Sequence, residues 1–225
     1  MANEPSLSIS ELFYSIQGES TFAGLPCVFI RTAGCNLRCS YCDAAYTYEE
    51  AGREMPLAAI LHYIENYPLA LVEITGGEPL LQHNVYPLMA SLVARNHTVL
   101  LETNGSQPLD LVPIEVHAIV DIKCPGSGME SSWLAANLQE VRNRAAARPN
   151  STEIKFVLRD MQDYQFARSF VRKQALCEVA PVLFSPVRDT LPLLLLAQAI
   201  LDDELPVRLQ LQLHTVIWPT VARGV

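Results

Sequence analysis

Apolar residues along the chain fall into short runs typical of strands and longer runs with helical periodicity. The strand-like runs are residues 27–32, 71–75, 98–103, 118–122, 153–158, 182–185 and 208–213. The runs with helical spacing are residues 57–66, 85–95, 132–147, 162–173 and 191–202. Pro56 is placed to open the first of these helices and Asn84 to cap the second. This alternation predicts parallel strands joined by right-handed crossovers.

Seven strands and five helices are too few for a complete (β/α)8 barrel, which takes about 250 residues. The pattern therefore favours an α/β fold in which a parallel, TIM-like barrel is partial and open. Polar groups follow six of the strands: Arg31-Thr32, Thr75-Gly76-Gly77-Glu78, Glu102-Thr103-Asn104, Asp121 with Lys123, Ser185-Pro186, and His214. Because the carboxyl ends of parallel strands assemble the site in such barrels, we expect these residues to meet.

The composition fits one domain, because 225 residues, 50% of them hydrophobic, can bury a single sizeable core. Sixteen Lys and Arg residues against 24 Asp and Glu give a net charge of -8, and no basic cluster stands out, so we expect no nucleic-acid partner. The start of the chain lacks the features of a signal peptide, and the apolar run 191–201 is too short to span a bilayer. We therefore expect no membrane contact and a cytoplasmic location.

The most informative feature is a loop in which Cys35, Cys39 and Cys42 have the spacing C-x3-C-x2-C. The next histidine and the next cysteine are far along the chain, at His62 and Cys124. Structural zinc sites and ordinary iron–sulfur clusters take four protein ligands. Three cysteines leave one iron of a [4Fe-4S] cluster open, and an open position is where a metal centre does chemistry. Such clustering also suits metal ligation in a reducing compartment better than a disulfide framework.

The spacing of the cysteines, with Tyr41 before the last one, resembles the radical S-adenosylmethionine (radical SAM) superfamily. The resemblance implies that S-adenosylmethionine binds the open iron and that reduction of the cluster cleaves it to a 5′-deoxyadenosyl radical. It also implies an open, partial barrel. A zinc site in a loop is the alternative that the spacing alone leaves open.

Three further motifs follow strands. In Thr75-Gly-Gly-Glu-Pro79 the glycines let backbone amides approach a ligand and Glu78 offers a carboxylate to an ammonium group, although a tight turn is the alternative. Glu102 would place a charge at the inner mouth of the barrel, although the Asn-Gly after it is also a common turn. Asp121 and Lys123 lie on the same side of a strand, as an ion pair or as contacts to a cofactor.

Motifs near both ends of the chain indicate one family within this superfamily. The segment Ser15-Ile-Gln-Gly-Glu19, the motifs described above and a terminal Gln212-Leu-His214 occur in the order found in the 7-carboxy-7-deazaguanine synthase family, over nearly the whole chain. This resemblance implies a lyase that converts 6-carboxy-5,6,7,8-tetrahydropterin into 7-carboxy-7-deazaguanine and ammonia in queuosine and 7-deazapurine biosynthesis. It also implies a low-potential electron donor such as flavodoxin, and a homodimer. The single domain, 1–225, would begin with a substrate-binding segment of about residues 1–26.

The same resemblance assigns the site residues. The cluster ligands would be Cys35, Cys39 and Cys42. The residues implied to hold S-adenosylmethionine are Tyr41, Asp43, Gly77, Glu78, Asp121, Ile122, Lys123, Ser185 and Pro186. The residues implied to contact the pterin are Ile16, Gln17, Gly18, Glu19, Arg31, Thr75, Glu102 and His214. A guanidinium pairs with a carboxylate in two parallel hydrogen bonds, which supports Arg31, although a salt bridge to Asp43 or Glu19 is the alternative.

One position departs from the family pattern. The family usually has a threonine after the Cys-Asp pair, and its hydroxyl helps to bind Mg2+, whereas this chain reads Cys42-Asp43-Ala44. Asp43, Thr47, the substrate and water can still supply oxygen ligands, so the resemblance leaves Asp43 as the magnesium ligand.

Two other functions stay open. A glycyl-radical-enzyme activase shares the cysteine spacing, but its macromolecular substrate does not require Gln17, Glu19 and Arg31 around a small pocket. An iron–sulfur electron carrier would need four cluster ligands and would have no use for Gly76, Gly77 and Glu78. No side chain is assigned as a catalytic acid or base.

Overall fold

The computed structural model describes residues 4–225, which form one sheet of nine strands in the order β3-β1-β2-β4-β5-β6-β7-β8-β9. The strands are β1 (Ser6–Ile16), β2 (Pro26–Thr32), β3 (Arg53–Pro56), β4 (Leu71–Gly76), β5 (Val99–Thr103), β6 (His117–Asp121), β7 (Thr152–Leu158), β8 (Val182–Pro186) and β9 (Arg208–Leu209). From β2 onward all neighbours in the sheet run parallel, whereas β1 is antiparallel to β2 and β3. Within the described residues β3 and β9 do not pair, so the predicted open, partial barrel is confirmed.

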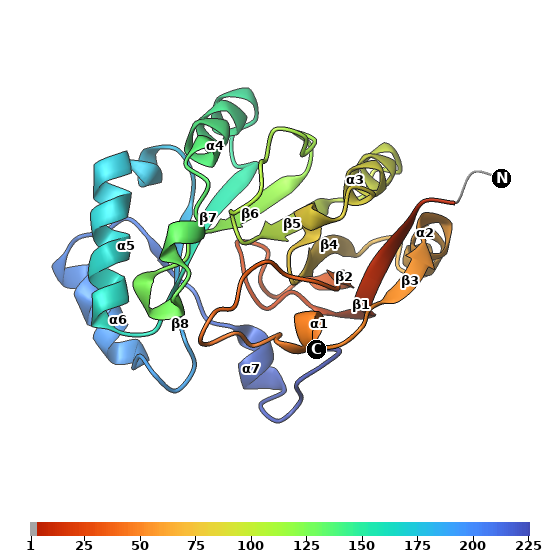
Figure 1. Cartoon of the computed structure of the whole chain (residues 1–225). Coiled ribbons are helices and arrows are strands. Elements are labelled where there is room, and N and C mark those ends of the chain that lie inside the picture. Colours follow the sequence, from red (N-terminus) through yellow and green to blue (C-terminus); the bar gives the residue numbers. More distant parts are fainter. Residues whose placement is uncertain (1–3) are drawn as a thin grey trace.

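The longer helices cover the outer face of the sheet (Figure 1). The helices are α1 (Tyr46–Glu49), α2 (Leu57–Ile64), α3 (Val85–Ala94), α4 (Ala136–Ala147), α5 (Met161–Gln174), α6 (Leu193–Asp202) and α7 (Leu213–Ile217). They pack on outward strand residues such as Val28, Val72 and Phe156 in one continuous core. The longest helix, α5, has 14 residues, and no helix in residues 4–225 has the length and apolar character of a bilayer-spanning segment.

The predicted strands and helices are all present, with three differences. The predicted strand 208–213 extends only over Arg208–Leu209, and the predicted helix 132–147 begins at Ala136. Asn84 precedes α3, but its side chain donates to the carbonyl of Ser6 at 2.8 Å instead of capping the helix. Two strands, β1 and β3, were not predicted. Residues 1–3, where the predicted substrate-binding segment begins, lie outside the described residues.

Side chains along the parallel strands alternate between the helix-facing core and the barrel interior, as the strand period of two requires. On β4, Val72 and Ile74 belong to the core, whereas Glu73 and Thr75 line an interior cavity. On β7, Phe156 belongs to the core and Lys155 lines the cavity. The barrel interior therefore holds charged and polar side chains beside apolar ones such as Phe29.

Residues 17–25 join β1 to β2 and are here called the interior loop. This loop fills part of the barrel interior. Its Thr21 donates its amide to Glu153 of β7 at 3.0 Å. Its Phe22 packs edge-on against His117 of β6, with 5.0 Å between the ring centroids. His117 Nε2 in turn lies 2.9 Å from Glu153 Oε1. These contacts fix the interior loop against the amino-terminal halves of β6 and β7, so its first residues face the other end of the barrel.

Candidate active site

A cavity of about 410 Å³ lies at the carboxyl ends of the parallel strands. The predicted site residues in its wall are Ile16, Gln17, Gly18, Glu19, Arg31, Cys35, Cys39, Tyr41, Cys42, Asp43, Thr75, Gly77, Glu102, Asp121, Lys123 and His214. A larger depression of about 640 Å³ lies near the starts of β7 and β8 and contains none of the predicted residues. The sequence motifs therefore converge on one cavity, even though they are spread from residue 16 to residue 214.

The three cysteines of the cysteine loop, Cys35, Cys39 and Cys42, are free thiols in the cavity wall. Gly77 supports this loop from behind, because a Cβ at that position would overlap the Gly34 carbonyl and lie 2.8 Å from Cys35 Cβ. No three His, Cys, Asp or Glu side chains within residues 4–225 converge on the position of a single ion. Three thiols that line one cavity without converging fit a cubane cluster, in which each thiolate binds a different iron.

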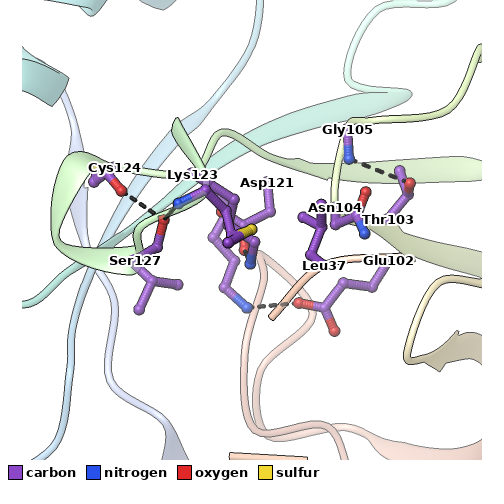
Figure 2. Close-up of polar contacts among 12 residues, drawn as sticks. Leu37, Glu102, Thr103, Asn104, Gly105, Asp121, Lys123, Cys124 and Ser127 are labelled. Atoms are coloured by element: carbon purple, nitrogen blue, oxygen red, sulfur yellow. Dashed lines mark hydrogen bonds and ion pairs between the residues drawn. The ribbon is translucent and has the colours of Figure 1, made fainter. Parts of the chain in front are cut away.

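Asp121 and Lys123, at the end of β6, form an ion pair of 2.6 Å, and Figure 2 shows both beside the end of β5. Burial alone would lower the pKa of Lys123, but the charge of Asp121 raises it above its ordinary value. The second oxygen, Asp121 Oδ1, is buried and has no hydrogen-bond partner in the described part of the chain, and the same holds for Ser185 Oγ on β8. Buried polar atoms are normally satisfied, so Asp121 Oδ1, whose residue lines the cavity, fits a bound ligand with hydroxyl or amino groups, whereas Ser185 does not reach the cavity wall.

Four residues implied to hold S-adenosylmethionine are not in the cavity wall: Glu78, Ile122, Ser185 and Pro186. Glu78 is fully buried and accepts hydrogen bonds from the amides of Leu80 and Asn104, at 3.0 and 2.7 Å, and from Thr103 Oγ1 at 2.9 Å. Burial raises the pKa of Glu78 to about 7, against the effect of those three donors. This geometry does not support the contact with a ligand ammonium group; Glu78 ties the loop after β4 to the end of β5.

Arg31, on β2, lies opposite Glu11 of β1, and its Nε is 3.1 Å from Glu11 Oε2. Tyr46 donates to the same oxygen at 2.7 Å. The salt bridge to Asp43 or Glu19 left open by the sequence is not formed, and the guanidinium makes no other ion pair within residues 4–225. Burial alone would lower the pKa of Arg31, but Tyr46, Asp43 and Glu11 raise it above its ordinary value. A cation that remains charged therefore faces the cavity with its terminal nitrogens available.

Three glutamates and one lysine, Glu19, Glu73, Glu102 and Lys155, form the cavity floor. Lys155 Nζ lies 2.6 Å from Glu102 Oε1 and also contacts Glu19. Burial alone would raise the pKa of Glu102, which is labelled in Figure 2, but the charge of Lys155 lowers it to about 2. Glu73 has no such partner: burial, reinforced by the charges of Glu102 and Glu19, raises its pKa well above the ordinary value.

The far end of the chain supplies the remaining wall. Gln212 donates to Glu19 Oε1 at 2.9 Å and to Asp43 Oδ2 at 3.4 Å. A Cβ on Gly18 would lie 2.6 Å from His214 Nδ1, so glycine is required for α7 to approach the interior loop. Figure 1 shows α7 beside α1 and the C-terminus. His214 is thus in the predicted site but is carried by a helix instead of a strand end.

Among the wall residues to which the sequence analysis gave no role in the site are Glu73, Lys155, Gln212 and Tyr46. Glu73 and Lys155 carry a usable signal, since each is a charge at an alternate position of an otherwise apolar strand, and buried charges are usually partnered or functional. Gln212 begins the terminal motif that ends in His214. No sequence signal points to Tyr46.

Comparisons with known proteins show what this chain is similar to. The radical SAM superfamily matches residues 29–122. A 7-carboxy-7-deazaguanine synthase from Chlorobaculum tepidum is 46% identical over 225 residues, which cover 100% of both chains. Another from Koribacter versatilis is 44% identical over 97% of this chain and 100% of its own. The crystal structure of QueE from Escherichia coli superposes with a TM-score of 0.71 over 92% of this chain and 94% of that one, at 23% identity, and so shares the fold.

The buried Glu78 makes stability depend on pH. Its pKa rises from about 4.5 in the unfolded chain to about 7 in the folded protein. The protonated Glu78 therefore contributes fully to the free energy of unfolding below pH 4.5, and this contribution is lost as the pH rises to 7. The substitution Glu78→Gln removes this titration. The unfolding free energy of the wild type minus that of Glu78→Gln should therefore fall between pH 4.5 and pH 7, by at most about 3 kcal/mol. Urea unfolding of both proteins across this range measures the difference, and a constant difference would contradict the assignment.

Proposed function

Because the chain belongs to the 7-carboxy-7-deazaguanine synthase family of radical SAM enzymes, we propose that it converts 6-carboxy-5,6,7,8-tetrahydropterin into 7-carboxy-7-deazaguanine and ammonia, a step in queuosine and 7-deazapurine biosynthesis. The observation that carries the proposal is that one cavity contains a loop with three free cysteines, an arginine for a carboxylate and a polar floor. The family implies a [4Fe-4S] cluster and S-adenosylmethionine, which when bound supply a hydrogen-abstracting radical.

We assign the cluster to Cys35, Cys39 and Cys42. Asp121 Oδ1, which has no hydrogen-bond partner within residues 4–225 and whose residue lines the cavity, supports a place for S-adenosylmethionine between the cysteine loop and the end of β6. Ser185, on β8, is proposed as a further contact. The remaining contacts proposed on that side are Tyr41, Asp43, Gly77, Ile122, Lys123 and Pro186. Tyr41 spans from the cysteine loop to β7, where its hydroxyl donates to the Val157 carbonyl at 3.0 Å, and so holds the loop against the barrel.

The substrate is assigned to the side of the cavity formed by β2, β4 and the interior loop. Arg31 binds its carboxylate, and Thr75 lies directly across the β2–β4 pair from Arg31. The further contacts proposed are Ile16, Gln17, Gly18, Glu19, Glu102 and His214. In this assignment the N-terminal part of the domain, about residues 1–26, supplies four of the eight proposed substrate contacts. The protein contributes by holding the C6–H bond of the substrate in a fixed position and by excluding competing hydrogen donors.

Magnesium is assigned to Asp43, with the Thr47 hydroxyl as a second proposed oxygen ligand. Thr47 Oγ1 donates to the Ala44 carbonyl at 2.8 Å and lies in the cavity wall, so its lone pairs are the available oxygen donor beside position 44. We also propose a low-potential donor such as flavodoxin, a homodimer and a cytoplasmic location. The exposed Leu194 and Leu201 of α6, with 81% and 69% of their surface accessible, support a homodimer.

Anaerobic incubation of the reconstituted protein with the tetrahydropterin, S-adenosylmethionine and a strong reductant tests the function. Mass analysis should detect 7-carboxy-7-deazaguanine and 5′-deoxyadenosine. Alanine at Cys35, Cys39 or Cys42 should abolish the absorbance of the cluster and both products, because a cluster with two cysteine ligands is not retained. Alanine at Cys27, Cys124 or Cys177 should leave the cluster in place. Loss of the cluster in Cys124→Ala would mean a site with four ligands and would refute the open iron.

Arg31→Ala should reduce substrate turnover by two to four orders of magnitude, because a buried carboxylate without its partner costs about 3–5 kcal/mol. Reductive cleavage of S-adenosylmethionine and the cluster spectrum should persist. The matched control is Glu11→Gln, which removes the ion pair of Arg31 and keeps an oxygen for Tyr46. If both variants lose turnover equally, Arg31 acts through its bridge to Glu11 and not on the substrate.

Ala44→Thr should strengthen the magnesium dependence of turnover, because it restores a hydroxyl beside Asp43. The wild type should respond to magnesium more weakly, through Asp43 and the substrate carboxylate. Titration of both proteins after treatment with a chelator measures the effect, and cluster content should be equal in the two. No response from either protein would remove magnesium from this enzyme.

A further inference from the structure

Glu73 is a buried carboxyl group in the cavity floor that the proposed function leaves without a role. Only 3% of its surface is accessible, yet it lines the cavity from the inner face of β4. No cation in residues 4–225 forms an ion pair with it. Lys155 is occupied by Glu19 and Glu102, and the Arg31 guanidinium is paired with Glu11.

The charges around Glu73 decide its protonation. Glu102 and Glu19 share the charge of Lys155, so a third ionised carboxylate on this floor would be buried without a counter-charge. Burial and the repulsion of Glu102 and Glu19 raise the pKa of Glu73 well above its ordinary value, and Lys155 and Arg31 oppose this only in part. Like-charged carboxyl groups that share a buried site keep one proton between them, and here the unpaired group, Glu73, holds it.

Hydrogen bonds from the interior loop fix where that proton lies. The Glu19 amide donates to Gln17 Oε1 at 3.0 Å, which orients the Gln17 side chain with its NH2 group toward β4. Gln17 Nε2 then donates to Glu73 Oε2. Since Oε2 is held as an acceptor, the proton of Glu73 belongs on Oε1, which accepts no hydrogen bond within the described residues. Glu73 therefore presents an O–H donor on Oε1 beside an acceptor on Oε2.

The strand register gives the depth of this donor. Arg31 lies opposite Thr75 and Phe29 lies opposite Glu73, so Glu73 is two residues deeper in the barrel than the arginine assigned to the substrate carboxylate. Two residues of a strand span roughly 6–7 Å. This distance suits a two-ring heterocycle whose carboxylate meets Arg31 and whose far edge meets the floor.

We propose that Glu73 is a specificity-determining residue that, as a neutral acid, donates from Oε1 to the 4-oxo oxygen of a pyrimidinone ring and accepts from its N3–H on Oε2. The pairing selects 4-oxo heterocycles such as pterins over 4-amino analogues, which would place an NH2 group against the O–H donor. Glu19 and Glu102, whose carboxylates both pair with Lys155, offer acceptors, which suits a 2-amino group. The inference rests on the proposed function, because it takes the carboxylate of the substrate to lie at Arg31.

Two pteridines that do not react test the proposal: 6-carboxypterin, and 2,4-diaminopteridine-6-carboxylic acid as its 4-amino counterpart. Dissociation constants are measured by fluorescence on the reconstituted protein with S-adenosylmethionine and no reductant. The wild type should bind the 4-oxo compound at least tenfold more tightly than the 4-amino compound. A wild type that binds both equally would overturn the proposal without any variant.

The variants Glu73→Gln and Glu73→Leu distinguish a protonated Glu73 from an ionised Glu73 and from a Glu73 that makes no contact with the ligand. Glutamine keeps a donor beside an acceptor in the same shape, so Glu73→Gln should keep the preference within about threefold. Leucine removes both groups, so Glu73→Leu should lose the preference by about tenfold, with cluster content and circular dichroism as controls for folding. A loss in Glu73→Gln equal to that in Glu73→Leu would mean that Glu73 acts as a carboxylate, and an unchanged preference in Glu73→Leu would mean no contact. Either result overturns the proposal.

Infrared spectroscopy gives a measurement without ligand. Glu78, with a pKa of about 7, contributes a protonated carboxyl group in both proteins at pH 7. The spectrum of the wild type minus that of Glu73→Gln should therefore show the C=O stretch of one further protonated carboxylic acid, and its absence from this difference would refute a neutral Glu73. Turnover of the tetrahydropterin by the wild type tests the proposed function separately. If no deazaguanine forms although the two pteridines are discriminated, the function fails and the specificity of Glu73 stands. If product forms without discrimination, only this inference fails.

Discussion

The buried ammonium group of Lys155 is the interaction on which the cavity depends. It joins Glu19 of the interior loop to Glu102 of β5 from the inner face of β7. A buried charge is tolerated only when it is paired, and loss of one partner typically costs about 3–5 kcal/mol. Without this cation two carboxylates would face each other on the floor, and Glu19 of the interior loop would lose its ion pair. The charge balance of the floor therefore follows from one side chain.

Strands could be predicted from the sequence where both of their faces are buried, and the prediction failed where one face is exposed. Parallel strands are covered by helices on one face and by the side chains and loop inside the barrel on the other, so their sequences are short apolar runs. For this reason the sequence predicted β2 and β4 to β8. Strand β1 carries exposed and half-buried positions, including Tyr14 with 45% of its surface accessible, and so lacks that signal. The stretch 208–213 alternates like a strand at Leu209, Leu211 and Leu213, yet it leaves the sheet after Leu209 and crosses toward the interior loop.

The candidate site could be predicted where local motifs carry it, as in the cysteine loop and the loop after β4. Glu78 shows the limit of that reasoning, since its motif fixes its place in the chain but not which side of the loop its carboxylate faces. Glu73 and Lys155 were missed for a different reason. The role of a charge inside an apolar strand depends on what packs inside the barrel. Here that is the interior loop, whose Gln17 lies 56 positions away from Glu73 along the chain.

The contacts of Gln212 bear on how the protein is made. It reaches back 169 positions to Asp43 and 193 positions to Glu19. At roughly 5–20 residues per second, a ribosome needs about 8–34 s to extend the chain from Asp43 to Gln212. Throughout that interval the three thiols belong to a nascent chain whose side wall has not yet been synthesised. The wall beside the thiols is therefore among the last parts of the cavity that the ribosome supplies.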